Sequence, residues 1–589
     1  MNIRLVSIFI LLGINVFAFA GIKYYVNGNT GNNSNNGTSP STAFQTINYA
    51  AGQANFGDTI LVMEGIYTNP SYGVYEFFKN QSDCTIYINN KNPGANQYNY
   101  LVIKPYENDR VILRGDGLMI VHIKNSSYIK VEGFEVYGEV ENIPLDSALQ
   151  YQFLYLDEDD NIKYRLPPFT PIEVVEDTIL PILPPGIKRP TYFNTSGMGA
   201  MNCHHIEFSS NYVHHMPGEG IRSFDSDFII FKDNEVHDCS RRSSTGVHGM
   251  SVYTMISMGT EPDSFTIKMT QNRVHHNYNE LYSWSSTKTF INPHIDEGKG
   301  ITVQRCTASR DWDIGRILIE NNIAYENGLS GIHANEGERV EIRNNSLYNN
   351  HYSGVGNNHG ISLQSSYDIK IRNNIVTRNS TGYSISVSSN STNIVINRNM
   401  VVGTLNSTAN NIATNTSYTD PKYYNPAEYV FRLKSTSQAI NFPNVNNAPP
   451  IDFYGNVRDN NPDLGAAEYI TGCTTIVTSS NDSGTGTLRD KLNCAQEGDT
   501  ITFAANISSC TLNNALYNTK NVFIKGPAAN YVNINQNQTN PPLFPRFINK
   551  PSKTLKLQNI RFQNSGNTNE SSQVINHGKM IIMGNVIVK

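Results

Sequence analysis

The sequence has few charged residues, and beyond its first twenty residues it has no apolar run long enough to cross a membrane. Charged side chains make up 16% of the 589 residues, whereas ~25% is usual. The net charge is −5, which argues against nucleic acid as a general partner. Asn, Ser, Thr and Gly carry the polarity instead, and this composition favours turn-rich β structure over helices.

Cysteine is also scarce. Seven cysteines are too few for a disulfide scaffold, and an odd number leaves at least one unpaired within the chain. Cys473, Cys494 and Cys510 cluster late in the sequence and could form one bridge. The sequence lacks a CxxC pair and an HExxH motif, so no motif predicts a zinc site.

The first twenty residues are typical of a secretory signal peptide. Arg4 supplies the positive charge, residues 5–19 are mainly apolar, and Ala18-Phe19-Ala20 is a cleavage site of the small-x-small type. We therefore expect cleavage near Ala20 and a secreted or cell-surface protein that does not span the membrane. An uncleaved membrane anchor is the alternative, although the apolar run is short for one.

A repeat that occurs seven times is the strongest signal in the sequence. Each match has an Asn with apolar residues five and three positions before it, and most have another apolar residue two positions after it. The asparagines are Asn211, Asn234, Asn272, Asn322, Asn345, Asn374 and Asn399. A leucine-rich repeat is excluded because its LxxLxLxxN pattern and helical periodicity are missing. Stacked coils of short parallel strands fit instead. The asparagines would take tight turns, tolerate left-handed backbone and form a ladder of amide hydrogen bonds.

A second strand is predicted before several of these matches. The strands open with Gly220-Ile221, Gly300-Ile301, Gly331-Ile332 and Gly360-Ile361. Because side chains alternate along a strand, the isoleucines are expected to face inward and the residues after them outward. The outward residues are Arg222, Thr302, His333 and Ser362. Stacking of the coils would place them in one exposed column.

Insertions interrupt the repeat on both sides of the strand that begins at Gly300. Residues 240–258 and 278–299 are extra residues before such strands, and "CTASRDWDIGR" lengthens the turn after Ile301. Insertions in a solenoid form loops, which often lie on the binding face. We therefore predict a groove along the outward column with these loops as its walls.

Charged residues gather in the predicted groove, and three roles are assigned to them. The candidate catalytic residues are Lys299, Arg305, Arg310 and His294. The candidate substrate-binding residues are Arg222, Arg241, Arg242, Trp312 and His333. The candidate metal ligands are Asp296 and Glu297, whose oxygen atoms could hold Ca²⁺. The alternative is that these loops are solvated and carry only weak ion pairs.

This mixture of charges suits an acidic polysaccharide. Arginine binds uronate or sulfate groups through two hydrogen bonds, and Trp312 could stack on a sugar. Ca²⁺ and nearby cations would acidify the proton beside a substrate carboxylate. Lys299 or an arginine could then abstract that proton if its neighbours favour the neutral form, which would be β-elimination. One alternative is a non-catalytic surface or adhesion protein that only binds glycan. The other is a glycoside hydrolase, for which Asp311 and Asp313 could supply one of two carboxylates.

The N-terminal segment resembles a known family. Residues 24–67 begin with "YYVNGNTGNN" and end with "GDTILVMEGIY", and they resemble the opening cap of secreted right-handed parallel β-helix proteins of the pectate-lyase-like superfamily. The resemblance extends from about Lys23 to Gly403 and implies an all-β, right-handed parallel β-helix. This superfamily contains lyases, hydrolases, epimerases and non-catalytic proteins, so the resemblance does not select an activity. The DDG motif of the familiar calcium-dependent lyases is absent from the sequence.

We predict three parts after the signal peptide of residues 1–20. Residues 21–403 are expected to form the β-helix, 404–470 a closing segment and 471–589 a second, partial β-helix. Residues 451–469 are similar to the segment that closes many bacterial β-helix surface proteins. Within the first part, residues 138–197 are a proline-rich insertion that is expected to lack regular strands and to lie beside the helix; a disordered insertion is the alternative.

Overall fold

The computed structural model describes residues 21–588, apart from residues 76–77, 95–97, 108, 152–153, 157–158, 160–161, 167–169, 173–189, 244, 283–296, 354–357, 379–382, 407–411, 415, 473, 514, 529, 537–546, 551, 563–573 and 584–585. The predicted signal peptide, His294 and Asp296 lie outside the described residues. No helix among the described residues is long and apolar enough to cross a membrane.

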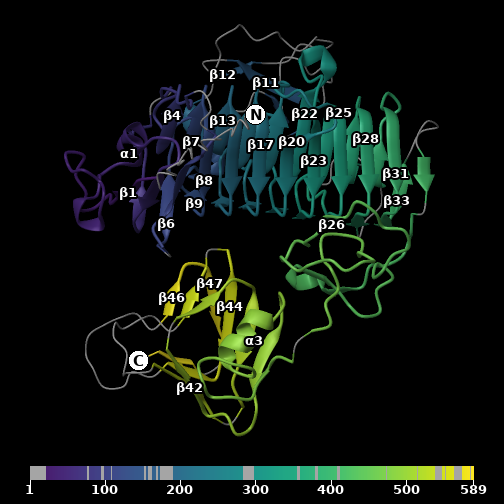
Figure 1. The fold of residues 1–589 in the computed structure, drawn as a ribbon. Coiled ribbons are helices and arrows are strands. Elements are labelled where there is room, and N and C mark those ends of the chain that lie inside the picture. Colours follow the sequence, from purple (N-terminus) through teal and green to yellow (C-terminus); the bar gives the residue numbers. More distant parts are fainter. Residues whose placement is uncertain are drawn as a thin grey trace, which may run out of the picture.

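Three parallel sheets wrap around one core, and each coil of the chain adds a strand to each sheet in turn (Figure 1). The first sheet contains β4 (Ile86–Asn89), β7 (Met119–Lys124), β13 (Ser196–Met201), β16 (Ile221–Phe224), β19 (Met250–Tyr253), β22 (Ile301–Cys306), β25 (Ile332–Arg343), β27 (Asn358–Gln364), β30 (Tyr383–Val387) and β33 (Thr404–Asn406). β25 continues around the corner and also pairs in the second sheet.

The second sheet contains β1 (Lys23–Val26), β2 (Thr59–Val62), β5 (Leu101–Pro105), β8 (Ser127–Glu132), β14 (His204–Ser209), β17 (Asp227–Lys232), β20 (Phe265–Thr270), β23 (Arg316–Glu320), β25, β28 (Tyr367–Arg372), β31 (Thr392–Asn397) and β34 (Ile412–Thr414). The third sheet contains β3 (Gly65–Tyr67), β6 (Val111–Arg114), β9 (Glu135–Tyr137), β15 (Tyr212–His214), β18 (Glu235–His237), β21 (Arg273–His275), β24 (Ile323–Tyr325), β26 (Ser346–Tyr348), β29 (Ile375–Thr377) and β32 (Met400–Val402). This architecture is a parallel β-helix, as the repeats predict.

The seven asparagines form the predicted ladder at the corner between the second and third sheets. The amide nitrogen of each of the first six donates to the side-chain oxygen of the asparagine in the next coil at 2.9–3.1 Å. The same oxygen also accepts from a backbone N–H at 2.9–3.0 Å. These fully buried amides are therefore paired, which removes the cost of burying them.

One detail of the turn prediction is wrong. The left-handed backbone belongs to the residue before each asparagine of the ladder, with φ between 51° and 58°. These residues are Ser210, Asp233, Gln271, Asn321, Asn344, Asn373 and Arg398. A second ladder, absent from the predictions, lies five residues further on, where Asn277, Asn327 and Asn350 bond in sequence at 2.9 and 2.8 Å.

The core is made of aliphatic side chains that stack from coil to coil. Ile221, Ile301, Ile332 and Ile361 are fully buried and occupy equivalent positions in adjacent strands, which confirms their predicted inward orientation. Burial of each such side chain contributes about 1.5–3 kcal/mol before the entropy of ordering is subtracted.

A cap and an insertion frame the N-terminal half of the β-helix. The cap contains η1 (Pro40–Thr42) and the short helix α1 (Ile47–Gln53), which begins at Thr46, whose hydroxyl accepts from the N–H of Tyr49. The insertion contains η2 (Val140–Asn142), α2 (Leu145–Gln150), η3 (Thr191–Phe193) and an antiparallel sheet of β10 (Leu154–Leu156), β11 (Ile162–Leu166) and β12 (Thr170–Ile172). The expectation that it lacks regular strands is therefore wrong for β10, β11 and β12.

The closing segment packs along the left-handed turn residues of the second sheet. It contains β35 (Tyr423–Asn425), η5 (Pro426–Glu428) and β36 (Val430–Leu433). Arg458 is buried and donates to Glu468 at 2.8 Å and to the side chain of Asn321 at 3.0 Å. Buried Arg458 thus links the closing segment to one of the left-handed turn residues.

The C-terminal part is a second, smaller set of parallel coils (Figure 1). It begins with β37 (Ile476–Val477) and α3 (Leu488–Cys494), and its remaining strands are β38 (Thr500–Phe503), β39 (Ser509–Leu512), β40 (Leu516–Asn518), β41 (Val522–Lys525), β42 (Val532–Gln536), β43 (Phe547–Asn549), β44 (Thr554–Gln558), β45 (Ile560–Phe562), β46 (Val574–Asn576), β47 (Lys579–Ile582) and β48 (Val586–Val588). Asn518, Asn549 and Asn576 form its own ladder at 2.8 and 2.7 Å. Cys494 is disulfide-bonded, Cys510 is a free buried thiol, and Cys473 lies outside the described residues.

Candidate functional site

The predicted outward column exists on the first sheet. The strand register aligns Arg222, Ser251, Thr302, His333 and Ser362 in five successive coils. Contrary to the prediction of an exposed column, all but Arg222 are buried, and the Arg222 side chain is only 16% exposed. The column is therefore a row of polar groups in a closed environment.

A second polar row runs beside the first, two residues before the inward side chains of Ile221, Met250, Ile301 and Ile332. It consists of Glu219, His248, Lys299 and Ser330, and their carbonyl oxygens accept backbone hydrogen bonds from the preceding coils at 2.8–3.2 Å. Neighbouring strands are about 4.8 Å apart, so an acid, an imidazole and an ammonium follow one another at this spacing. We call the two rows together the polar cluster.

Glycines allow the coils to approach closely beneath this second row. A Cβ atom on Gly220 would lie 2.5 Å from the carbonyl oxygen of Gly249, and one on Gly300 would lie 2.5 Å from that of Gly331. No other residue fits such positions. The sequence pattern of a polar residue, then Gly, then an apolar residue thus marks the second row of the polar cluster.

Glu297 links the members of the second row. Its Oε2 atom accepts from Lys299 Nζ at 2.8 Å and lies 3.7 Å from His248 Nδ1. Gln304 Nε2 lies 3.0 Å from His248 Nε2. An amide nitrogen donates, so this contact leaves the Nε2 atom of a neutral His248 as an acceptor and directs its Nδ1–H toward Glu297.

Burial controls protonation in the polar cluster. It raises the pKa of Glu219 to about 7, although Arg222 and Ser251 oppose the shift. Burial, together with Lys299 and His248, holds the pKa of His333 well below its usual value. The polar cluster therefore contains a carboxylic acid that keeps its proton at near-neutral pH and an imidazole that stays neutral.

Several buried atoms of the polar cluster have no hydrogen-bond partner within the described part of the chain. They are Glu219 Oε1, Arg222 Nε and Thr302 Oγ1. An unpaired buried polar atom costs about 1–3 kcal/mol, and most buried polar atoms in proteins are paired. A cluster of them on one face indicates positions that a polar ligand or ordered water would fill.

The structure brings only some of the predicted site residues together. Arg222, Glu297, Lys299 and His333 join the polar cluster. Arg305 lies at the other end of β22, where it donates to the hydroxyl of Tyr253 at 2.7 Å. The exposed residues Arg310, Asp311 and Asp313 follow it. These residues are separated from Lys299 by the length of β22, roughly 17–20 Å.

Three predicted substrate-binding residues have structural contacts instead. Trp312 is fully buried in the core, and its Nε1 donates to the carbonyl oxygen of Glu338 at 3.2 Å; as a surface for sugar stacking it is a wrong prediction. Arg241 pairs with Asp238 at 3.0 Å and with Glu280. Arg242 pairs with Glu280 and donates to the carbonyl oxygen of Ile143 at 2.8 Å, so the two arginines tie neighbouring loops together.

The described neighbours of Glu297 do not fit the predicted calcium site. Ca²⁺ requires six to eight oxygen ligands, whereas Glu297 contacts an ammonium and an imidazole. Asp296 lies outside the described residues. No step of the chemistry below is assigned to a calcium ion.

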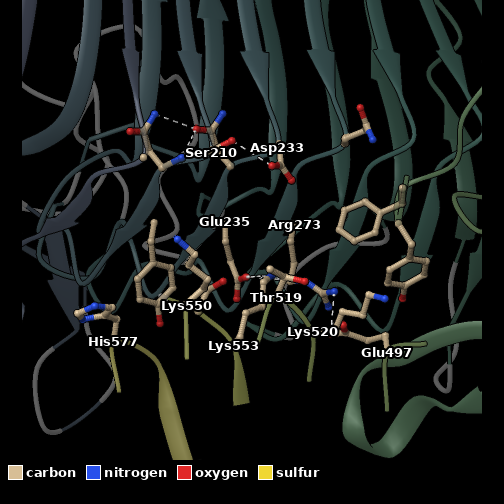
Figure 2. A pocket seen from close by; sticks show the side chains of 18 of the residues that line it. Ser210, Asp233, Glu235, Arg273, Glu497, Thr519, Lys520, Lys550, Lys553 and His577 are labelled. Carbon is tan, nitrogen blue, oxygen red and sulfur yellow. Dashed lines mark hydrogen bonds and ion pairs between the residues drawn. The ribbon is translucent and has the colours of Figure 1, made fainter. Parts of the chain in front are cut away.

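A separate cavity of about 980 Å³ lies between the β-helix and the C-terminal part (Figure 2). Asp233, Glu235 and Arg273 line it from the β-helix, while Glu497 and Lys553 line it from the C-terminal part. Arg273 pairs with Glu497 at 3.5 Å, and Lys553 pairs with Glu235 at 3.8 Å. These ion pairs join the two parts, so the cavity is a junction between them and we do not assign the chemistry to it.

Comparison with known proteins supports the fold. Residues 263–419 match the family described as a right-handed β-helix region. A search of curated proteins gave no match.

The similar solved structures include a pectate lyase, with 15% identity over 76% of this chain and 97% of that chain and a TM-score of 0.39. A lacto-N-biosidase from Eubacterium ramulus has 11% identity over 68% of each chain and a TM-score of 0.36. An alginate lyase from Paenibacillus has 12% identity over 63% of this chain and 96% of that chain and a TM-score of 0.31. At these identities and TM-scores the similarities carry no argument about activity.

Proposed function

Because the chain is a right-handed parallel β-helix protein whose first sheet carries a buried acid–base cluster, we propose that it binds an acidic polysaccharide there and cleaves it by β-elimination. The observation that carries this proposal is a buried Glu219, whose pKa is raised to about 7, one coil away from His248, whose Nε2 lies 3.0 Å from the amide nitrogen of Gln304. A secreted or cell-surface location, as predicted from residues 1–20, would give such an enzyme access to its polymer.

Each member of the polar cluster has a role in this mechanism. Arg222 and Lys299 would hold the substrate carboxylate, which lowers the cost of negative charge that develops beside it. His248 Nε2 would take the proton next to the carboxylate once the substrate displaces Gln304 from it, with Glu297 beside the Nδ1 side of the ring at 3.7 Å. The electrons of the broken C–H bond form the new C=C bond, and Glu219 gives its proton to the departing glycosidic oxygen.

Lys299 is assigned to charge stabilisation rather than proton abstraction. The Lys299 Nζ atom donates to Glu297 Oε2 at 2.8 Å, so the structure shows it as a hydrogen-bond donor and not as an acceptor of a proton. The sequence-based hypothesis of Lys299 as the base is therefore replaced by His248, and Lys299 remains in the site as a cation.

Glycoside hydrolysis is a second candidate because the polar cluster holds two carboxyl groups. Glu219 would protonate the leaving oxygen, and Glu297 would activate water. Glu219 precedes β16 and Glu297 precedes β22, and one coil, that of β19, lies between them. The backbones at the two residues are therefore about 10 Å apart. This spacing is compatible with the separation of ~6.5–9.5 Å in inverting enzymes once the side chains extend.

One experiment separates these activities. The protein is incubated with pectate, alginate and glycosaminoglycans, and both the ultraviolet absorbance of unsaturated uronates and the release of reducing ends are followed. Elimination raises both signals, whereas hydrolysis raises only the reducing ends. Retention on an immobilised glycan without any product would indicate a non-catalytic binding protein and would reject the proposed catalysis.

The Lys299→Ala variant tests the carboxylate-binding role in the same assay. We expect a decrease in kcat/KM of roughly 10–100-fold, because one charge-assisted contact in a buried site is lost. Lys268→Ala, on the outward face of β20, is the matched control and should leave the rate unchanged. Equal rates for the two variants would remove Lys299 from the site.

A further inference from the structure

A second group of polar side chains lies at the corner that follows the third sheet, and the proposed function does not use it. His214, His237 and His275 stack in successive coils with ring centroids 5.2 and 4.8 Å apart. The next residue in each coil has a positive φ and contacts its neighbour directly. His214 and His215 approach at 2.8 Å through their Nδ1 atoms, and His237 Nδ1 lies 2.7 Å from Asp238 Oδ2.

Three of these residues converge as a set of metal ligands would. His215, His237 and Asp238 each offer one ligand atom, and these atoms all lie within 4.8 Å of one another. His215 and Asp238 are half-buried, while His237 is buried. The group is therefore fixed by the fold and still reachable from solvent.

The donor set indicates the class of ion. Two imidazoles and one carboxylate suit Zn²⁺ and similar transition-metal ions, whereas Ca²⁺ and Mg²⁺ prefer oxygen ligands. With metal–ligand distances of about 2.0–2.2 Å, two ligand atoms of a tetrahedral site lie roughly 3.3–3.5 Å apart. To bind the ion, His237 Nδ1 and Asp238 Oδ2, which lie 2.7 Å apart, would have to move slightly apart. The pairs of ligand atoms that are further apart, up to 4.8 Å, would have to move closer together.

Neighbouring side chains orient two of the ligands. His237 Nε2 lies 2.9 Å from the hydroxyl of Tyr212, and the other oxygen of Asp238 accepts from Arg241 at 3.0 Å. Such outer contacts fix the ring orientation of a ligating histidine and the position of a ligating carboxylate. An ion would lie between His237 Nδ1 and Asp238 Oδ2, which now contact each other directly.

We propose that His215, His237 and Asp238 form an open, three-ligand site for a zinc-type divalent ion. His215 follows β15, whereas His237 and Asp238 come from the next coil, so the ion would bridge two successive coils. Three protein ligands leave one coordination position for water or another ligand.

The test is calorimetric titration of the metal-free full-length protein with Zn²⁺. We expect one ion per chain and a melting temperature that rises with Zn²⁺ concentration. His237→Ala should weaken binding at least about 100-fold and remove the rise in melting temperature. Asp238→Asn, which preserves shape, should weaken binding roughly 10–100-fold.

Two controls make the outcome decisive. His205→Ala, a half-buried histidine of β14, should bind Zn²⁺ as the wild type does. Co²⁺ should give the visible absorption of a nitrogen- and oxygen-ligated tetrahedral site in the wild type and not in His237→Ala. Zn²⁺ binding that is absent, or unchanged in both His237→Ala and Asp238→Asn, would overturn the assignment, whatever the result of the glycan assays.

Discussion

Glu219→Gln is expected to lower kcat/KM for the polysaccharide by about 10²–10⁴-fold, the usual contribution of a positioned general acid. Glutamine has nearly the same shape as the protonated acid and cannot give a proton to the leaving oxygen. The rate is measured with whichever polymer of the panel is cleaved. Binding of the polymer should change much less than kcat, because the contacts of Arg222 and Lys299 remain.

The stability of this variant provides the control. Burial raises the pKa of folded Glu219 to about 7 from 4.5, so the folded protein binds the proton more tightly than the unfolded chain. The stabilisation that this protonated carboxyl group adds to the free energy of unfolding is fully present below about pH 4.5. It is lost as the pH rises toward 7, by at most ~3 kcal/mol. Glu219→Gln should therefore be at least as stable as the wild type at neutral pH.

Glu207→Gln serves as the matched activity control. Glu207 faces outward from β14 and pairs with Lys130 at 3.0 Å, and it belongs to the second sheet rather than the polar cluster. Its replacement should leave kcat/KM unchanged. A Glu219→Gln enzyme that retains the wild-type rate would exclude Glu219 as the proton donor.

Asn345→Ala should lower the free energy of unfolding of the β-helix by about 3–5 kcal/mol. The Asn345 side chain donates to Asn374 and to the carbonyl oxygen of Ile319, both at 2.9 Å. It also accepts from the backbone and side chain of Asn322 at 2.9 and 3.0 Å. Alanine would leave several of these buried groups unpaired, at about 1–3 kcal/mol each.

Urea denaturation, followed by far-ultraviolet circular dichroism, measures this effect. Asn335→Ala is the matched control because Asn335 lies half-buried in the preceding strand β25 and outside the ladder. It should change the stability by less than about 0.5 kcal/mol. Equal destabilisation by the two variants would show that the ladder contributes nothing beyond an ordinary asparagine.

The sequence predicted the fold because the signals that specify a β-helix are local and repeated. Alternating apolar residues and an Asn at a fixed offset recur in seven coils, so the register of Ile221, Ile301 and Ile332 follows from the spacing alone. The outward position of Arg222 and His333 follows from the same alternation. The left-handed residue was misplaced by one position because sequence preference for Asn does not distinguish the ladder amide from the turn residue before it.

The site was only partly predictable, because burial depends on loops whose packing is not local. The sequence does not show that Trp312 enters the core or that Glu280 pairs with Arg241 and Arg242. Glu219 is not predicted for another reason. Strand alternation identifies the residue after each strand-opening Gly-Ile pair as outward, whereas the acid, imidazole and ammonium of the second row stand before the glycine.

The pH dependence of kcat/KM is the most direct test of the proposed catalysis. If Glu219 is the proton donor, the wild-type rate should fall about tenfold per pH unit above roughly pH 7, and this descending limb should be missing in Glu219→Gln. A wild-type rate that stays level to about pH 9, or a variant that keeps the same descending limb, would contradict the assignment of the polar cluster as an acid–base site.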